Sequence, residues 1–284
     1  MYQSTQYPTA SGSISAIEIG EPSTALVTLV FIHGWLDNAA SFVSVFEQLA
    51  SVSHIHAIAI DLPGHGLSSH KSASSYYPFH DYIDDIYQVL HKISPNKLVL
   101  VGHSLGALIA SCYSAAFPEQ VAGLVQIEGK GPLSESPQKS VQRMRNGVLS
   151  RQRQQRKPSR PLRSQEDAIM LRAHVNELPR ETIAPIVKRG TVLKDGHWHW
   201  SHDQRLKCDS IYRMSPEHAQ VINMAIQCEQ LIILGDNGFD YLLNDSDTFH
   251  NVRAKLVTIP GGHHCHLEYP ERVSELILGL VNKI

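Results

Sequence analysis

The sequence predicts an α/β protein with a mostly parallel β-sheet covered by helices on both faces. Nearly continuous apolar runs recur along the chain, and stretches of helical periodicity stand between most of them. Such runs, about five to seven residues long, are typical of strands buried on both faces. Each run ends in a glycine-containing segment. In a parallel sheet these ends meet at one edge, which is where ligands bind.

The expected strands lie, in chain order, within residues 26–34, 54–66, 97–106, 121–131, 230–238 and 254–262. Ahead of them, the first 20 residues alternate loosely around Gly12, a pattern that favours a hairpin at the edge of the sheet. Apolar residues at steps of three and four predict helices over 41–50, 79–93, 105–117 and 271–284. Alternating strands and helices require right-handed crossover connections.

The alternation stops between residues 132 and 225. We therefore expect a core domain made of 1–131 and 226–284, with 132–225 inserted as a helical cap over the strand ends. From Lys139 to Arg163 the insertion holds nine Lys or Arg and no acid. A solvated helix face or a mobile loop is the simplest interpretation of this run, and an acidic partner or an anionic surface is the alternative. The stripe formed by Val141, Met144 and Val148 is expected to pack on the core rather than on a membrane.

Composition limits the function classes. The 284 residues carry a net charge of -2, with 42% hydrophobic and 18% charged residues, so no overall attraction to nucleic acid or anionic membranes is expected. The four cysteines form no CxxC pair, which favours a reducing compartment. Neither a signal peptide nor an apolar stretch of membrane-spanning length is visible, so a cytoplasmic protein is predicted.

The segment Gly102-His103-Ser104-Leu105-Gly106 has the pattern GxSxG between a predicted strand and a predicted helix. In this context the pattern indicates a nucleophile elbow, a turn so tight that the residues two before and two after the serine must be small. The turn exposes the Ser104 hydroxyl at a helix N-terminus, which favours developing negative charge. The alternative is a glycine-rich turn without chemistry.

A serine nucleophile needs a base, and in this architecture the histidine follows the last strand. There the segment GGHHCHLEYP offers His263, His264 and His266, of which His263 directly follows the glycine turn. We therefore predict His263 as the base. A metal site that uses these histidines with Cys265, or one that uses His197, His199 and His202, is the less favoured interpretation, and no metal is predicted.

An oxyanion hole needs two backbone N–H groups. The residue after the nucleophile, Leu105, is expected to supply one of them. The second is expected from Trp35, in the glycine-containing loop His33-Gly34-Trp35 after the strand 26–32. The ring of Trp35 either lines the acyl pocket or serves in packing.

Together these motifs resemble the α/β-hydrolase superfamily: HGW at 33–35, DLPGHGLSS at 61–69, GHSLGA at 102–107 and GGHHCHLEYP at 261–270. The segments FIHGWLDNAASF (31–42), GHGLSSH (64–70) and DQRL (203–206) are similar to the narrower serine hydrolase-like family. This resemblance implies an eight-stranded, mostly parallel sheet and a serine-dependent hydrolase with a helical cap. The turn Asp61–Gly66 is expected to shape the floor of the site without taking part in the chemistry.

The triad acid departs from the pattern of the superfamily. Where the superfamily usually has the aspartate of a G-x-x-D turn after the strand 230–235, the turn Gly235-Asp236-Asn237-Gly238 of this chain has a glycine, with Asp236 too early and Asp240 somewhat late. The end of the strand after the nucleophile helix can also supply the acid, and Glu128 stands there. A carboxylate at that buried edge needs a partner, such as a histidine N–H or a cap arginine. Glu128 and Asp240 both stay candidates.

The sequence thus predicts an ester hydrolase that acts through an acyl-enzyme on a small-molecule acyl substrate, with no cofactor. Lactone, thioester and carbon–carbon bond hydrolysis, as well as acyl transfer, begin from the same residues, and a non-catalytic ligand receptor is the rival class. A homodimer is common for such domains, but the sequence does not demand one. The candidate substrate-contacting residues are Trp35, His103, Trp198, Trp200 and His202.

Overall fold

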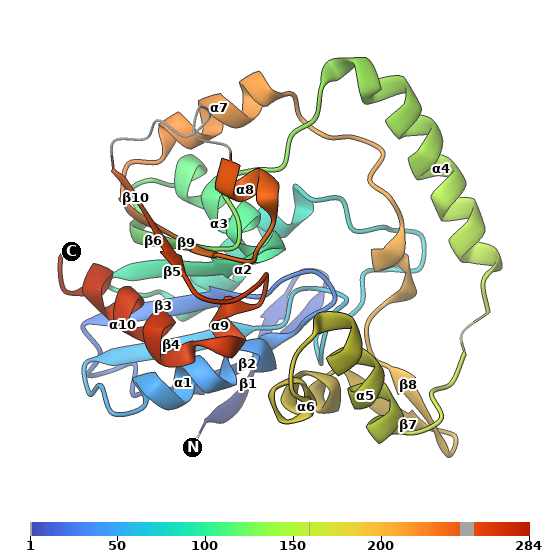
Figure 1. The fold of residues 1–284 in the computed structure, drawn as a ribbon, viewed down its shortest axis with the longest axis horizontal. Helices are drawn as coiled ribbons and strands as arrows, with labels where there is room; N and C mark the ends of the chain where they lie inside the picture. Colours follow the sequence, from blue (N-terminus) through green and yellow to red (C-terminus); the bar gives the residue numbers. More distant parts are fainter. Residues whose placement is uncertain (1, 159, 245–252) are drawn as a thin grey trace.

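The computed structural model describes residues 2–158, 160–244 and 253–284. Its centre is an eight-stranded sheet in the order β1-β2-β4-β3-β5-β6-β9-β10 (Figure 1). The strands are β1 (Gln3–Thr9), β2 (Gly12–Ile19), β3 (Val27–Ile32), β4 (Ile55–Ile60), β5 (Leu98–His103), β6 (Val121–Ile127), β9 (Glu229–Gly235) and β10 (Ala254–Ile259). Strands from β4 to β10 pair in parallel. The predicted fold class is thereby confirmed.

The antiparallel edge of the sheet begins the chain. The strands β1 and β2 form a hairpin in which Thr9 pairs with Gly12, and β2 pairs antiparallel with β4. Gly12 has a φ of 136°, a conformation that residues with a side chain rarely adopt. The hairpin predicted around Gly12 is therefore present.

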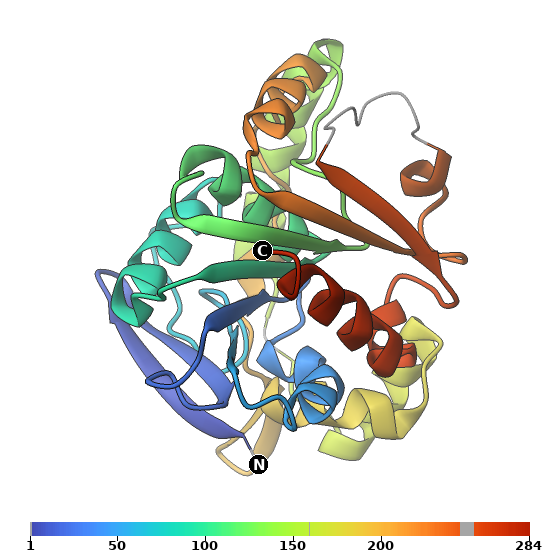
Figure 2. The ribbon, with the colours of Figure 1, turned by 90° about the vertical axis from the view of Figure 1, so that its left-hand side faces the viewer.

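Helices cover both faces of the sheet and enclose two hydrophobic cores (Figure 2). On one face α1 (Val43–Leu49) and α10 (Pro270–Val281) pack with Phe31, Phe42 and Phe46. On the other face α2 (Asp81–Ile93) and α3 (Leu105–Ala116) pack with Ile58, Leu100 and Leu124. Burial of apolar surface on both faces explains why the central strands lack polar alternation.

The segment between β6 and β9 contains most of the remaining elements. They are α4 (Ser140–Arg156), α5 (Gln165–Asn176), α6 (Arg180–Arg189), the hairpin β7 (Thr191–Lys194) and β8 (His197–Trp200), and α7 (Pro216–Ala225), with short 3-10 helices at Pro137–Lys139 and Gln204–Lys207. A further 3-10 helix, Ala39–Phe42, lies between β3 and α1. In Figure 1, α4, α5, α6 and the hairpin stand apart from the sheet on one side. By contrast, α7 packs against α3 of the sheet. The core and cap boundaries at 132 and 225 stay a prediction.

The apolar stripe on α4 faces outward. The exposed fractions of Val141, Met144 and Val148 are 75%, 49% and 49%. The prediction that this stripe packs on the core is therefore wrong. The buried side of α4 carries Gly147 and Ser150 instead. A Cβ at position 147 would lie only 3.0 Å from the Cα of Ile211, so the backbones approach closely there. Close backbone approach, rather than hydrophobic burial, sets the orientation of this helix.

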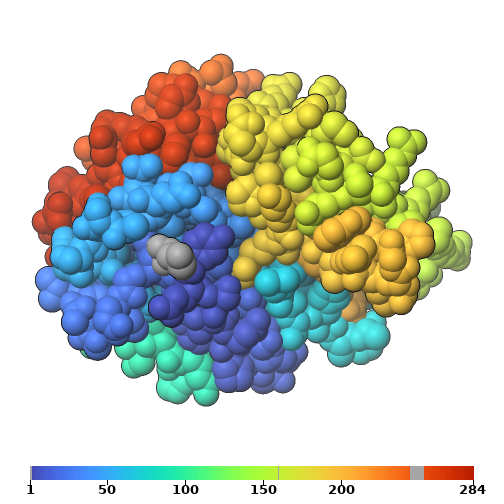
Figure 3. Space-filling view, turned by 90° about the horizontal axis from the view of Figure 1, so that it is seen from below, coloured from blue at the N-terminus to red at the C-terminus, as the bar shows by residue number. Residues whose placement is uncertain are grey.

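Two polar clusters hold the segment to the sheet domain. The Arg189 Nη2 lies 3.0 Å from Oδ2 of the fully buried Asp61. In the family motif DQRL, the Asp203 carboxylate accepts a hydrogen bond from the Tyr77 hydroxyl at 2.8 Å and pairs with Arg205. Arg205 also donates to the carbonyl of Lys71 at 2.8 Å. Figure 3 shows the outcome: the yellow part of this segment lies directly against the light-blue N-terminal part of the chain.

In the part of the chain that the structure describes, no helix is both long enough and apolar enough to cross a membrane.

Candidate active site

Ser104 stands in a strained turn between β5 and α3. Its φ of 50° and ψ of -115° lie outside the usual regions for a residue with a side chain. A Cβ at 102 would lie 2.3 Å from the carbonyl carbon of Gly106, and a Cβ at 106 would lie 1.9 Å from the Ile32 oxygen. The two glycines are therefore required by close backbone contacts, and strain of this kind is common at catalytic positions.

The loop after β3 touches the same turn. A Cβ on Gly34 would lie 3.4 Å from the Cβ of Ser104, so the next residue, Trp35, is held beside the elbow. Leu105 is the first residue of α3, where N–H groups have no acceptor within the helix. The oxyanion hole formed by the Leu105 and Trp35 N–H groups stays a prediction. Trp35 is 53% exposed, and its Nε1 donates to the carbonyl of Leu206 at 3.0 Å.

Glu128 and His263 are paired. The Glu128 Oε2 lies 3.2 Å from Nδ1 of His263, and its Oε1 accepts a hydrogen bond from the Gly235 N–H at 2.6 Å. Glu128 is only 3% exposed and has a φ of 51° directly after β6, so the chain turns sharply to deliver it. The ring of Phe239 packs against His263, with the two ring centroids 4.3 Å apart. The Nδ1 contact leaves Nε2 of His263 for other chemistry.

Asp240, the other candidate acid, is placed differently. It is the first residue of α8 (Asp240–Asn244) and is exposed. Within the described residues it forms no hydrogen bond or ion pair with His263. Asp236 is also directed elsewhere, because its Oδ1 accepts the Gly261 N–H at 3.0 Å and so organises the turn before His263. The structure thus brings Glu128, and not Asp240, to the imidazole.

His103 lies in a buried group of imidazoles rather than at the surface of a pocket. Its ring centroid is 4.2 Å from that of His266 and 4.9 Å from that of His263, and its Nε2 is 2.8 Å from the carbonyl oxygen of His263. Burial holds the pKa of His103 well below its usual range and lowers the pKa of His264 to about 3. These neutral rings pack beneath the His263 loop. Sequence reasoning missed this support, although the concentration of histidines at 263–266 was a visible signal.

Asp37 is another residue that sequence reasoning missed. It is 3% exposed, pairs with Arg172, and lies 3.9 Å from Nδ1 of His103 and 3.8 Å from Nε2 of His264. It therefore connects α5 to the imidazole group below the site. Its position in the segment FIHGWLDNAASF was the only sequence signal.

A cavity of about 660 Å³ opens at Ser104. Its lining includes Trp35, Leu105 and Glu128 but neither His103 nor Trp200. Trp200 packs instead among the buried residues of α5 and α6, and its ring lies 5.6 Å from that of His202. Trp198 bridges to Leu162. Trp198, Trp200 and His202 thus do not line the cavity at Ser104.

No group of three or more His, Cys, Asp or Glu residues within 2–158, 160–244 and 253–284 is arranged to hold a metal ion.

The fold and this site define a class, the alpha/beta hydrolases. The profile of the alpha/beta hydrolase fold family matches residues 27–270, so the chain belongs to that family. It is 29% identical over 265 residues to the probable serine hydrolase of Drosophila melanogaster, covering 88% of this chain and 79% of that protein. It is 26% identical over 263 residues to the serine hydrolase-like protein of Danio rerio, covering 87% and 78%.

Among solved structures, a hypothetical protein of Pseudomonas aeruginosa PAO1 superimposes with a TM-score of 0.87 at 25% identity, covering 99% of this chain and 97% of the other. The resemblance to the serine hydrolase-like family is thereby confirmed.

Proposed function

We propose that this alpha/beta hydrolase cleaves a carboxylic ester of a small molecule through an acyl-enzyme formed on Ser104. The observation that carries the proposal is the contact between Glu128 and His263, 3.2 Å from oxygen to Nδ1, at the edge of the sheet that also presents Ser104. A serine hydroxyl is weakly nucleophilic until a base accepts its proton, and a base oriented by a buried carboxylate meets that need.

In the acylation step, Nε2 of His263 accepts the Ser104 proton while the serine oxygen attacks the ester carbonyl. Glu128 accepts the Nδ1–H, which sets the imidazole tautomer and stabilises the imidazolium. The N–H groups of Leu105 and Trp35 stabilise the oxyanion of the tetrahedral intermediate. The imidazolium then donates its proton to the leaving alcohol as the carbon–oxygen bond breaks.

In the deacylation step, His263 accepts a proton from water, and the resulting hydroxide attacks the acyl carbon. The acid leaves with its new oxygen, and Ser104 regains its proton. The cavity of about 660 Å³ at Ser104 falls within the volume range of small-molecule sites. This size supports a small-molecule substrate.

Active-site labelling tests the proposal. A fluorophosphonate probe is expected to label Ser104 in the wild-type protein and not in Ser104→Ala, with peptide mapping as the readout. Hydrolysis of p-nitrophenyl esters of increasing acyl length should follow the same pattern. Folded wild-type protein that neither binds the probe nor hydrolyses any ester would support a non-catalytic ligand receptor instead.

A further inference from the structure

Arg213 stands in the wall between two cavities. It lines the cavity of about 660 Å³ that opens at Ser104, and it also lines a second cavity of about 290 Å³. The two cavities share Trp35, Leu105, Leu108 and Leu133 as well, so they are adjacent. A substrate bound at Ser104 lies in a cavity that Arg213 also lines.

Arg213 differs from most of the other partly buried arginines of the same segment. Four of them are each paired with a carboxylate: Arg143 with Glu135, Arg172 with Asp37, Arg189 with Asp61, and Arg205 with Asp203. A fifth, Arg151, lies over the ring of Tyr76, with its Cζ 4.0 Å from the ring centroid. Arg213 forms no hydrogen bond or ion pair with any residue that the structure describes. An arginine in a cavity wall without a carboxylate partner has five donors available to a ligand.

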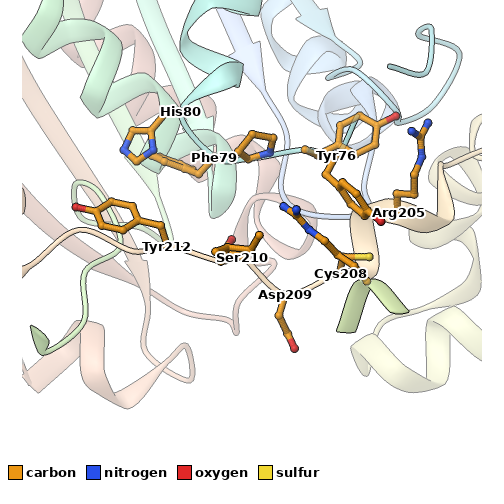
Figure 4. A pocket seen from close by; sticks show the side chains of 12 residues that line it. Tyr76, Phe79, His80, Arg205, Cys208, Asp209, Ser210 and Tyr212 are labelled. Atoms are coloured by element: carbon orange, nitrogen blue, oxygen red, sulfur yellow. The ribbon is translucent and has the colours of Figure 1, made fainter. Parts of the chain in front are cut away.

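The nearby carboxylates are committed elsewhere or exposed. Glu135 binds Arg143 through both oxygens, and Glu128 binds His263 and Gly235. Asp209 lines the second cavity but is exposed, so solvent screens its charge. In the neighbouring pocket of Figure 4, its side chain points away from Phe79, His80 and Tyr212. Glu217 lines the first cavity but is exposed, so solvent screens its charge.

Arg213 carries a positive charge in the walls of both cavities. Partial burial and the neighbouring Arg143 lower the pKa of Arg213 from its usual value. A guanidinium is so basic that it stays charged at neutral pH. The space around Arg213 therefore favours an anionic ligand.

Part of the cavity wall is apolar. Leu105, Leu108 and Leu133 line both cavities, and Phe79, Leu206 and Met214 line the second. We propose that the substrate of the Ser104 site carries a carboxylate joined to the scissile ester by an apolar segment, and that Arg213 binds this carboxylate. A carboxylate matches the planar guanidinium and can accept two parallel hydrogen bonds. This inference rests on the proposed function and specifies its substrate class.

Matched substrates test the inference. In the first pair, mono-p-nitrophenyl adipate is compared with methyl p-nitrophenyl adipate, which has the same acyl chain without the charge. In the second pair, 6-acetoxyhexanoate is compared with its methyl ester, so the carboxylate lies on the alcohol side. We expect kcat/KM for one charged ester to exceed that for its neutral partner by at least about 10-fold, as charge-assisted hydrogen bonds require.

Variants assign the preference to Arg213. In Arg213→Gln the ratio of charged to neutral kcat/KM is expected to fall at least about 10-fold, and Arg213→Lys should restore part of it. Arg145→Gln is the matched control, because Arg145 is an exposed arginine on α4 outside both cavity linings, and it should leave the ratio unchanged. Higher salt should also lower the ratio of charged to neutral kcat/KM in the wild type, but by less than Arg213→Gln lowers it.

The outcomes separate the two proposals. Ester hydrolysis with equal kcat/KM within both pairs, or a preference that Arg213→Gln leaves unchanged, overturns the carboxylate inference while the hydrolase assignment stands. If no ester is hydrolysed, calorimetric binding of monomethyl adipate to Ser104→Ala decides. Binding that is lost in Ser104→Ala/Arg213→Gln supports the anionic site, and absence of binding overturns it.

Discussion

The turns after β6 and after β9 lie side by side at one edge of the sheet, yet they are built differently. The turn after β6 places a carboxylate, Glu128, in a left-handed conformation and buries it against His263. The turn after β9 has no side chain at its first position, Gly235, and uses its N–H to donate to the same carboxylate. One turn supplies the acid and the other supplies a hydrogen-bond donor that holds it.

Close packing explains both glycines of the turn after β9. A Cβ on Gly235 would lie 2.3 Å from the carbonyl oxygen of Gly261 and 2.5 Å from that of Gly262. At Gly238, where the G-x-x-D pattern places the acid, a Cβ would lie 2.5 Å from Oε1 and 2.6 Å from Oε2 of Glu128. The Glu128 carboxylate therefore occupies the space that an acid at position 238 would need.

The largest effect is expected for Ser104→Ala. Without the serine oxygen no acyl-enzyme forms, so kcat for a p-nitrophenyl ester should fall on the order of 10⁶-fold, or to the buffer background. Steady-state kinetics measure this loss. Thermal unfolding serves as the control, because the substitution removes only one oxygen from a partly exposed side chain. Residual activity above about one per cent would indicate a different nucleophile.

The second effect concerns the turn after β6. Glu128→Gln keeps the size of the side chain but presents an amide to Nδ1 of His263, which favours the wrong tautomer. We expect kcat to fall about 10²- to 10⁴-fold with KM changed much less. Kinetics with the same ester measure the split. Activity close to that of the wild type would remove Glu128 from the mechanism.

An intermediate effect is expected when the turn after β9 gains a side chain. In Gly235→Ala the new methyl group contacts the Gly261 and Gly262 carbonyls, so the loop that carries His263 must shift. Overpacking of this kind costs about 1–3 kcal/mol of stability, and a displacement of about 1 Å costs up to about 10²-fold in rate. Gly279→Ala is the control, because nothing lies within 4 Å of its Cβ position. Equal melting temperatures for the two variants would show that position 235 has free space.

The smallest effect is expected for Asp240→Asn. Asp240 is exposed and has no contact with His263 among the described residues, so kcat should stay within about 2-fold of the wild type, as for most surface substitutions. The same ester assay measures it beside Glu128→Gln. If Asp240→Asn lost orders of magnitude while Glu128→Gln did not, the assignments of the two turns would be reversed.

Much of this architecture was predictable because the signals were local. The apolar runs predicted the parallel strands, and the elbow motif predicted the strained turn at Ser104. The choice between Glu128 and Asp240 was not, because it depends on a contact between residues far apart in the sequence, Glu128 and His263. The apolar stripe on α4 was predicted to face the core but faces outward. The helix packs through Gly147 and Ser150, where the backbones approach closely, and hydrophobic periodicity does not predict such contacts.

The contacts of Asp203 and Arg205 with Tyr77 and Lys71 join residues more than a hundred positions apart. No local pattern predicts such pairs. Arg213 was missed for the opposite reason, because an arginine without a carboxylate partner has no sequence signature, and only the structure shows that it lines the cavity at Ser104.

The central claim is that Glu128 orients His263, and NMR of the Nδ1 proton tests it most directly. In protein labelled with ¹⁵N-histidine, with His263 assigned by its loss in His263→Gln, a downfield Nδ1–H resonance is expected in the wild type and in Asp240→Asn. It should disappear or move strongly upfield in Glu128→Gln. A resonance that survives in Glu128→Gln and is lost in Asp240→Asn would contradict the account.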